Sequence, residues 1–151
     1  MESSVIPIEV EPDFIAPVVA DIRVEWDTVR PGIEEILEGN PQLTYRPEDV
    51  YSECVNERAT LFTSPVGFLV LTTQLDPFTG DKTLLIWIAY TYKKGAHNWV
   101  RHVEWFEEIA QVLSCRFIEA RSAVPELEAY ALKHGWSLDT RVYLREVFYG
   151  Q

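Results

Sequence analysis

Residues 84–113 read LLIWIAYTYKKGAHNWVRHVEWFEEIAQVL, and this stretch decides the fold. The part from Thr83 to Tyr92 is rich in aliphatic, β-branched and aromatic residues, which predicts a strand. In the part that follows, apolar residues step by four, three, four and three positions, the spacing that lines one helical face. They are Trp99, Val103, Phe106, Ala110 and Leu113. The stretch therefore predicts a strand that leads through a glycine-containing loop into a helix over residues 98–114.

Two tryptophans of this helix, Trp99 and Trp105, would point about 120° apart around the helix axis. Both therefore cannot face the core directly. Trp105 either lies on the flank of a wide apolar stripe or marks a surface for a partner, because tryptophan is enriched at interfaces.

The residues upstream predict two helices followed by two further strands. The helices are at 26–37 and 47–56, and the strands are at 59–63 and 66–74. Pro31 is expected to bend or restart the first helix, because proline lacks an N–H and clashes with the preceding turn. The link 76–81 contains Asp, Pro and Gly, the residues of a hairpin loop, so the strands are expected to run antiparallel.

The residues downstream predict a strand at 115–119, a helix from Pro125 to Gly135 and a last strand at 140–148. A strand, a crossover helix and another strand indicate one parallel pair within a mixed sheet. The fold class is therefore α/β, with a mostly antiparallel sheet and helices on both faces.

The first twenty residues are distinct from the rest. Pro7, Pro12 and Pro17 recur every five residues, which suits an extended arm better than a helix. This arm either packs on a partner subunit or lies over its own domain, and residues 21–151 form one domain.

Composition excludes several classes of protein. The chain has 151 residues, the size of one ordinary domain, and 47% hydrophobic residues, too many for a disordered chain. Its net charge of −11 disfavours contact with nucleic-acid phosphates. No apolar run approaches the roughly 20 residues that span a bilayer, and the start lacks the pattern of a secretory signal, so we expect a cytoplasmic protein without membrane contact.

The cysteines and histidines predict no metal site and no disulfide. Cys54 and Cys115 show no metal-type spacing and are expected to be reduced thiols. Cys54 could act as a nucleophile, but the sequence supplies no base beside it. The three histidines have no i, i+4 pairing.

The predicted order of elements, together with three short segments, resembles the Gcn5-related N-acetyltransferase (GNAT) superfamily. The segments are residues 84–99, Tyr130 to Trp136, which looks like the family's late helix with its Gly and aromatic ending, and Val142 to Val147, which is similar to its last strand. More narrowly, the aromatic helix, the length and Arg121 resemble the divergent GNAT-like proteins of tailed phages. The resemblance covers roughly residues 22–148.

The resemblance implies acetyl-coenzyme A as cosubstrate, bound where two central parallel strands splay apart. Its pantetheine would pair with the strand backbone at Ile88, Ala89 and Tyr90. Its pyrophosphate would lie on the amides of Gly95, Ala96, His97 and Asn98, where free N–H groups and the helix dipole favour an anion. Three cations, Lys93, Lys94 and Arg101, surround that turn. They either hold phosphate or are ordinary solvated side chains.

Acetylation of an amine needs a group that takes a proton from the ammonium and a donor to the departing thiolate. Glu119, at the end of its predicted strand, is the candidate base, or is simply an exposed carboxylate. Tyr130 is the phenol nearest to the position of the family's usual acid, one residue before it, or is a tyrosine packed on the sheet.

Two functions follow. The first is an acetyl-CoA-dependent N-acyltransferase acting on a small-molecule or protein amine. The second is a GNAT-like phage protein with weakened catalysis that serves as a virion-associated or partner-binding module, as a homo-oligomer or through its arm.

Overall fold

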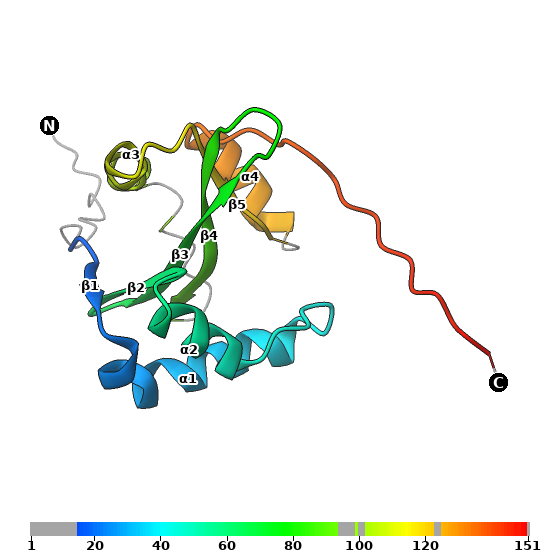
Figure 1. Ribbon diagram of the computed structural model, residues 1–151, viewed down its shortest axis with the longest axis horizontal. Helices are drawn as coiled ribbons and strands as arrows, with labels where there is room; N and C mark the ends of the chain where they lie inside the picture. The colour runs from blue at the N-terminus through cyan, green and yellow to red at the C-terminus, as the bar shows by residue number, and fades with distance from the viewer. Residues whose placement is uncertain (1–14, 94–98, 100–101, 123–124, 151) are drawn as a thin grey trace, which may run out of the picture.

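The computed structural model describes residues 15–93, 99, 102–122 and 125–150, and it contains a five-stranded sheet with helices on both faces (Figure 1). The strands are β1 (Val18–Ala20), β2 (Ala59–Ser64), β3 (Gly67–Leu75), β4 (Lys82–Thr91) and β5 (Phe117–Ala120). The helices are α1 (Ile22–Gly39), α2 (Pro47–Val55), α3 (Val103–Val112) and α4 (Pro125–Lys133). The α/β class predicted from the sequence is confirmed.

The strands follow one another across the sheet in chain order, β1-β2-β3-β4-β5. The first four pair antiparallel, and the β3–β4 turn is closed by a hydrogen bond of 2.8 Å from the Asp76 amide to the Asp81 carbonyl. β5 pairs parallel with β4, and α3 makes the crossover between them. The predicted meander and parallel pair are therefore confirmed.

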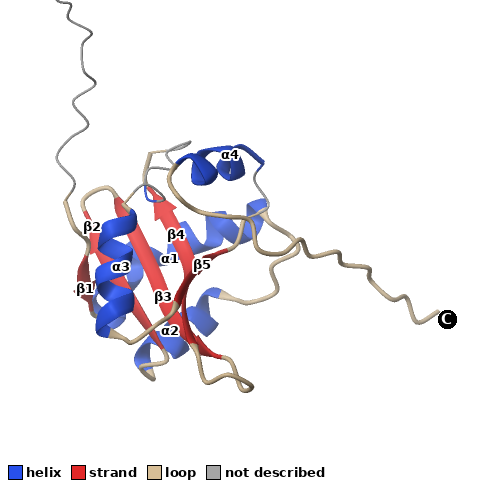
Figure 2. Cartoon of the chain, turned by 90° about the horizontal axis from the view of Figure 1, so that it is seen from above, coloured by secondary structure: helices blue, strands red, loops and turns tan. Residues whose placement is uncertain are grey.

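Two apolar cores lie on opposite faces of the sheet. In Figure 2, α1 and α2 lie behind the sheet and α3 lies in front of it. The first core joins α1 and α2 to the sheet, with Ile33 and Val50 fully buried at its centre. The second core joins α3 to the other face, with Phe106 and Leu84 fully buried. Burial on both faces is why β3 and β4 read as nearly continuous apolar runs.

One extra residue in β4 changes which of the two cores the later side chains of this strand enter. Leu71 of β3 pairs with Ile86, whereas Val70 pairs with Ile88, so Trp87 is left over as a β-bulge. Ile86 belongs to the second core and Ile88 to the first, although residues two apart on a regular strand share a face. The bulge therefore turns the last part of β4, including Tyr90, toward α1.

Helix α1 approaches the sheet closely at Gly32. A Cβ atom there would lie 2.8 Å from a ring carbon of Phe68 and 3.0 Å from the ring of Tyr90. These two rings stack on each other with centroids 5.2 Å apart. The lack of a side chain at Gly32 thus lets α1 lie directly over them. The helix also runs through Pro31 without a restart.

The last predicted strand, at 140–148, is wrong. Residues 136–150 contain no strand, and the end of this segment extends away from the sheet (Figure 1). An alternating sequence supplies only a local preference, and a strand forms only where an edge pairs with it. As a result β5 lies at the edge of the described sheet.

Two boundaries also differ from the prediction around α3. The helix begins at Val103, not at residue 98, and Trp99 precedes it in a short turn. Both tryptophans can therefore pack on the second core, Trp99 against Phe106 and Trp105 against Phe62. β5 spans Phe117–Ala120, slightly later than predicted.

The end of the predicted arm joins the sheet, because Val18–Ala20 forms β1 and pairs with β2. The arm's first fourteen residues lie outside the described part.

Replacing Gly32 by valine is expected to lower the free energy of unfolding by about 1–3 kcal/mol, because the new side chain would overlap the Phe68 and Tyr90 rings. Gly39→Val is the matched control, since a Cβ there meets nothing within 4 Å, and it should change stability by about 0.5 kcal/mol or less. Urea unfolding of both variants measures the difference. Equal losses would contradict the close approach at Gly32.

Candidate functional site

The parallel pair separates near the middle of β4. The last residues that pair are Ile86 and Ala120. Beyond them, the β4 residues from Trp87 to Tyr90 pair only with β3 among the described strands. Every second residue of such a stretch presents its N–H and C=O toward the side that β5 has left. The splay therefore provides a row of backbone hydrogen-bonding groups for a ligand.

Three predicted cofactor residues, Ile88, Ala89 and Tyr90, lie on this stretch of β4, which pairs with β3 but has no described strand on the β5 side. The side chain of Ile88 is buried in the first core, and that of Ala89 packs against the second. Tyr90 is half-buried under α1. The backbone of these residues is thus the part available to a ligand.

Tyr90 has a partner that the sequence analysis did not single out, Glu35 of α1. Burial makes the largest contribution to the raised pKa of the Tyr90 phenol. The negative charge of Glu35 and a hydrogen bond with Glu35 raise it further. The ring of Tyr92 lies edge-on to that of Tyr90, with centroids 5.9 Å apart. A signal for Glu35 exists in the sequence: it stands three residues after Gly32 and so lies near the same helical face. The structure thus brings a carboxylate and a phenol together at the end of the splay.

Glu119, the predicted base, lies on β5 opposite Leu85, before the splay begins. Its carboxylate forms an ion pair with Arg121, and Arg121 also donates a hydrogen bond of 3.3 Å to the Gln74 side chain. The carboxylate of Glu119 is therefore held in a pair with a cation.

Tyr130, the predicted acid, lies on α4 and packs on a residue of its own helical turn. Its ring centroid is 4.6 Å from that of His134. No interaction among the described residues joins Tyr130 to Tyr90 or Glu119.

Most of the predicted phosphate loop lies outside the described residues, namely Lys94, Gly95, Ala96, His97, Asn98 and Arg101. Lys93 is described and exposed, and its carbonyl accepts a hydrogen bond of 3.0 Å from the Thr91 hydroxyl. It lies two residues after Thr91, the last residue of β4.

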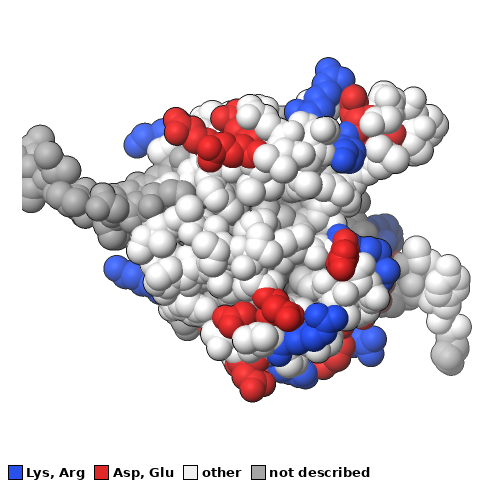
Figure 3. All heavy atoms as spheres, turned by 60° about the vertical axis from the view of Figure 1, so that its left-hand side comes forward, with Lys and Arg blue, Asp and Glu red and all other residues white. Residues whose placement is uncertain are grey.

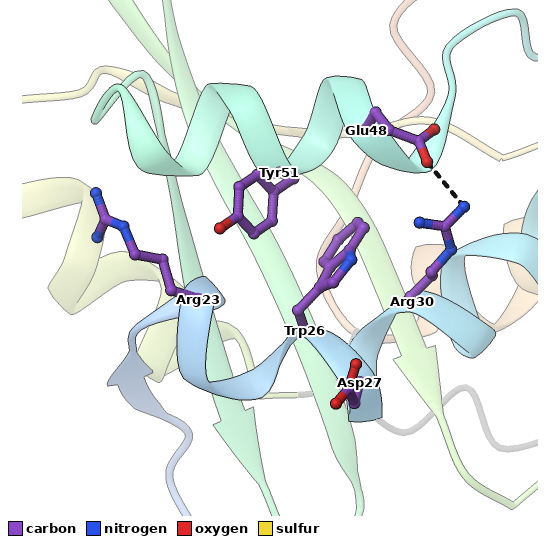
Figure 4. Close-up of a pocket in the computed structure, with 6 residues that line it drawn as sticks. All are labelled: Arg23, Trp26, Asp27, Arg30, Glu48 and Tyr51. Atoms are coloured by element: carbon purple, nitrogen blue, oxygen red, sulfur yellow. Dashed lines mark ion pairs between the residues drawn. The ribbon is translucent and has the colours of Figure 1, made fainter.

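A separate hollow of about 350 Å³ opens between α1 and α2 (Figure 4). Trp26 and Tyr51 meet edge-on within it, with centroids 4.9 Å apart. Arg30 forms an ion pair of 2.7 Å with Glu48, and Arg23 and Asp27 complete the lining. None of the predicted site residues lines this hollow, and its principal charges neutralise each other.

The negative excess does not make a single-sign surface. On the face in Figure 3, acidic and basic side chains lie side by side in small groups around a broad uncharged area. Within the described ranges, no three of His, Cys, Asp and Glu gather as metal ligands. Nor does any described helix have the length and apolar character to cross a membrane.

Both cysteines are free and half-buried. Burial, and secondarily the charge of Glu53, raise the pKa of the Cys54 thiol from 9.0 to about 11. The thiolate is the nucleophilic form, so this shift disfavours the reading of Cys54 as a nucleophile.

The raised pKa of Cys54 makes stability depend on alkaline pH. Below pH 9 the thiol is protonated in both the folded and unfolded states. As the pH rises toward about 11 the unfolded thiol ionises first, so the folded state loses stability. Urea unfolding of native protein and Cys54→Ala from pH 8 to pH 11 should show the smaller decline in the variant. Equal losses of stability with pH in the two proteins would contradict the raised pKa of Cys54.

Comparison with known proteins agrees with this architecture. No protein-family model and no curated sequence matches the chain. Among solved structures, one described as a probable acetyltransferase superposes with a TM-score of 0.65 at 13% identity, covering 91% of this chain and 100% of its own.

Two more similar structures are described by activity. A ribosomal-protein-alanine N-acetyltransferase from Brucella melitensis biovar Abortus 2308 has a TM-score of 0.64 at 12% identity, covering 88% of this chain and 100% of its own. An aminoglycoside acetyltransferase from an uncultured soil metagenomic sample, in complex with sisomicin, has a TM-score of 0.64 at 7% identity, covering 88% and 95%. Identities this low show the fold alone. The chain therefore has the GNAT fold that these acetyltransferases share.

Proposed function

We propose that the chain is an acetyl-CoA-dependent N-acyltransferase that transfers an acetyl group to a primary amine. The observation that carries this proposal is the backbone of β4 from Trp87 to Tyr90, which lies beyond the Ile86–Ala120 pair and has no described strand beside it on the β5 side. This stretch ends at Tyr90, beside Glu35. A fold shared with solved acetyltransferases supports it.

The residues present suit acetyl-CoA in two respects. The free N–H and C=O groups of β4 match the amides of a pantetheine arm, which is itself extended. Lys93, with Lys94 and Arg101 nearby in sequence, supplies positive charge for phosphate in a chain whose net charge is −11. Acetyl-CoA would supply the activated acetyl group as a thioester.

Glu35 and Tyr90 suit the two proton transfers of the reaction. The Glu35 carboxylate attracts an ammonium group and can accept its proton, directly or through water. The Tyr90 phenol is protonated at neutral pH, since its pKa is raised above the usual value of 10.0, and it can donate a hydrogen bond to a departing thiolate. Glu119 and Tyr130 are the alternative pair, and the two pairs are separable by mutation.

Titration with acetyl-CoA by calorimetry tests the cosubstrate. We expect micromolar binding, weakened about tenfold or more by Lys94→Glu, because the reversal places a negative charge beside phosphate. Lys82→Glu is the matched control: it makes the same charge change at the opposite end of β4 and should bind as the native protein does. Absence of heat at high concentration, or equal weakening by both variants, would overturn the cosubstrate assignment.

Release of free CoA, measured across a panel of primary amines, tests the proton-transfer groups. With an accepted amine, Glu35→Gln should lower kcat/KM by about 10²-fold or more, and Tyr90→Phe should also lower it. Glu119→Gln and Tyr130→Phe are the paired controls and should stay within a few-fold of the native rate. The opposite ranking would assign the chemistry to Glu119 and Tyr130 instead.

A second candidate is the partner-binding module, in the narrower form a phage protein with weakened catalysis. The exposed apolar side chains of residues 142–149 favour it, because such surfaces usually meet a partner. If the protein does not bind acetyl-CoA, the partner-binding function would replace the acyltransferase function.

A further inference from the structure

The hollow between α1 and α2 is a cavity that the proposed function does not use. Its volume of about 350 Å³ lies at the small end of the range for ligand pockets, about 300–1,000 Å³. Its lining comes from both helices, with Arg23, Trp26, Asp27 and Arg30 on α1 and Glu48 and Tyr51 on α2. None of these residues belongs to a strand, so the hollow is separate from the splay between β4 and β5.

One end of the hollow is closed by a cation whose charge is already balanced. The Arg30 guanidinium forms ion pairs of 2.7 Å with Glu48 and 3.3 Å with Glu34. It also lies over the Trp26 ring, 5.6 Å from the ring centroid. With two carboxylate partners, Arg30 acts as a wall of the hollow and offers no unbalanced charge to a ligand.

Two other charged groups of the lining, Arg23 and Asp27, lie one helical turn apart but do not pair with each other. Opposite charges four residues apart on a helix are neighbours and can form an ion pair. Here one nitrogen of the Arg23 guanidinium lies 3.5 Å from Asp21 instead. The Asp27 side chain forms no ion pair or hydrogen bond with any residue that the structure describes. The remaining N–H donors of Arg23 and the carboxylate of Asp27 are therefore available to a ligand.

Two aromatic rings provide the apolar part of the hollow. The rings of Trp26 and Tyr51 meet edge-on, with centroids 4.9 Å apart and an interplanar angle of 69°. Both residues are half-buried, so part of each ring faces the hollow. In Figure 4 the Tyr51 hydroxyl points toward Arg23, which places a neutral donor beside the cation. The hollow thus combines an aromatic surface with a cation and an anion on the same helix.

We propose that this hollow binds a free α-amino acid with an apolar or aromatic side chain. The carboxylate of the amino acid would meet Arg23 and the Tyr51 hydroxyl, and its ammonium would meet Asp27. Its side chain would pack on the rings of Trp26 and Tyr51. A ligand with one charged group would leave either Arg23 or Asp27 without a partner. An α-amino acid has no net charge, so the net charge of −11 does not repel it as it repels a simple anion.

The amino acid would bridge two helices, because it would contact α1 through Asp27 and α2 through Tyr51. A ligand that binds only the folded state raises the midpoint of thermal unfolding. The inference does not depend on the proposed function, since no residue of the hollow takes part in binding acetyl-CoA or in the proton transfers. Binding in the hollow without binding of acetyl-CoA, or the reverse, would separate the two proposals.

An NMR titration of the full chain with L-phenylalanine tests the site. The indole N–H signal of Trp26, assigned with Trp26→Phe, should shift with a Kd of about 1 mM or tighter. The midpoint of thermal unfolding should rise at the same concentrations. 3-Phenylpropionate lacks the ammonium group and phenethylamine lacks the carboxylate, so each should bind about tenfold or more weakly. No shift of this signal at about 10 mM L-phenylalanine, or equal affinity for the three compounds, would overturn the proposal.

Two substitutions separate the contributions of the charges. Asp27→Asn should weaken binding of L-phenylalanine about tenfold or more and leave that of 3-phenylpropionate unchanged. Arg23→Gln should weaken binding of L-phenylalanine equally and leave that of phenethylamine unchanged. Glu38→Gln and Arg58→Gln are the matched controls, because they remove exposed charges outside the hollow and should bind as the native protein does. Losses as large in the controls would overturn the assignment of the two charges.

L-phenylalanine is itself a primary amine, so one further variant distinguishes the hollow from the splay. Glu35→Gln changes the carboxylate beside Tyr90 and should leave the shift of the Trp26 signal and its Kd unchanged. Loss of the shift in Glu35→Gln would place the amino acid at the splay and overturn the proposal.

Discussion

The site depends on one extra residue, Trp87. The bulge that it makes in β4 moves Ile88 and Tyr90 onto the face covered by α1, whereas Leu84 and Ile86 remain on the face covered by α3. It stands at the point where β5 stops following β4. The bulge thus coincides with the end of the parallel pairing and, on the α1 face, brings Tyr90 beside Glu35. Bulges at such positions commonly redirect side chains at functional sites.

The stability of this fold depends little on its charged side chains. Among the described residues no charged or polar side chain is fully buried, and the cohesion comes from the two apolar cores. Most ion pairs, such as Arg30 with Glu48 and Arg58 with Glu53, are well exposed, and exposed pairs contribute about 0–1 kcal/mol each. The charged surface therefore contributes little to the stability of the fold.

Periodicity predicted the elements that bury one clear face, because burial and local spacing agree there. The first helix is of this kind. The central strands β3 and β4 were predicted from a different pattern, the nearly continuous apolar runs of strands buried on both faces. The spacing from Gly32 places Glu35 near the face of α1 that meets the sheet, but it does not say which strand residue Glu35 meets. That pairing with Tyr90, like the bulge at Trp87, depends on register between segments far apart in sequence. Residues 140–148 show the converse: a strong local strand preference does not provide the edge on which a strand must form.

The parallel pairing of β4 with β5 has a consequence for the order of folding. β2, β3 and β4 are joined by short turns, so their contacts close small loops and form quickly. β5 reaches β4 only after α3 and its connections have been ordered, so this contact closes a long loop at greater entropic cost. The meander is thus the natural nucleus, and the gap between β4 and β5, where a ligand would lie, is completed last.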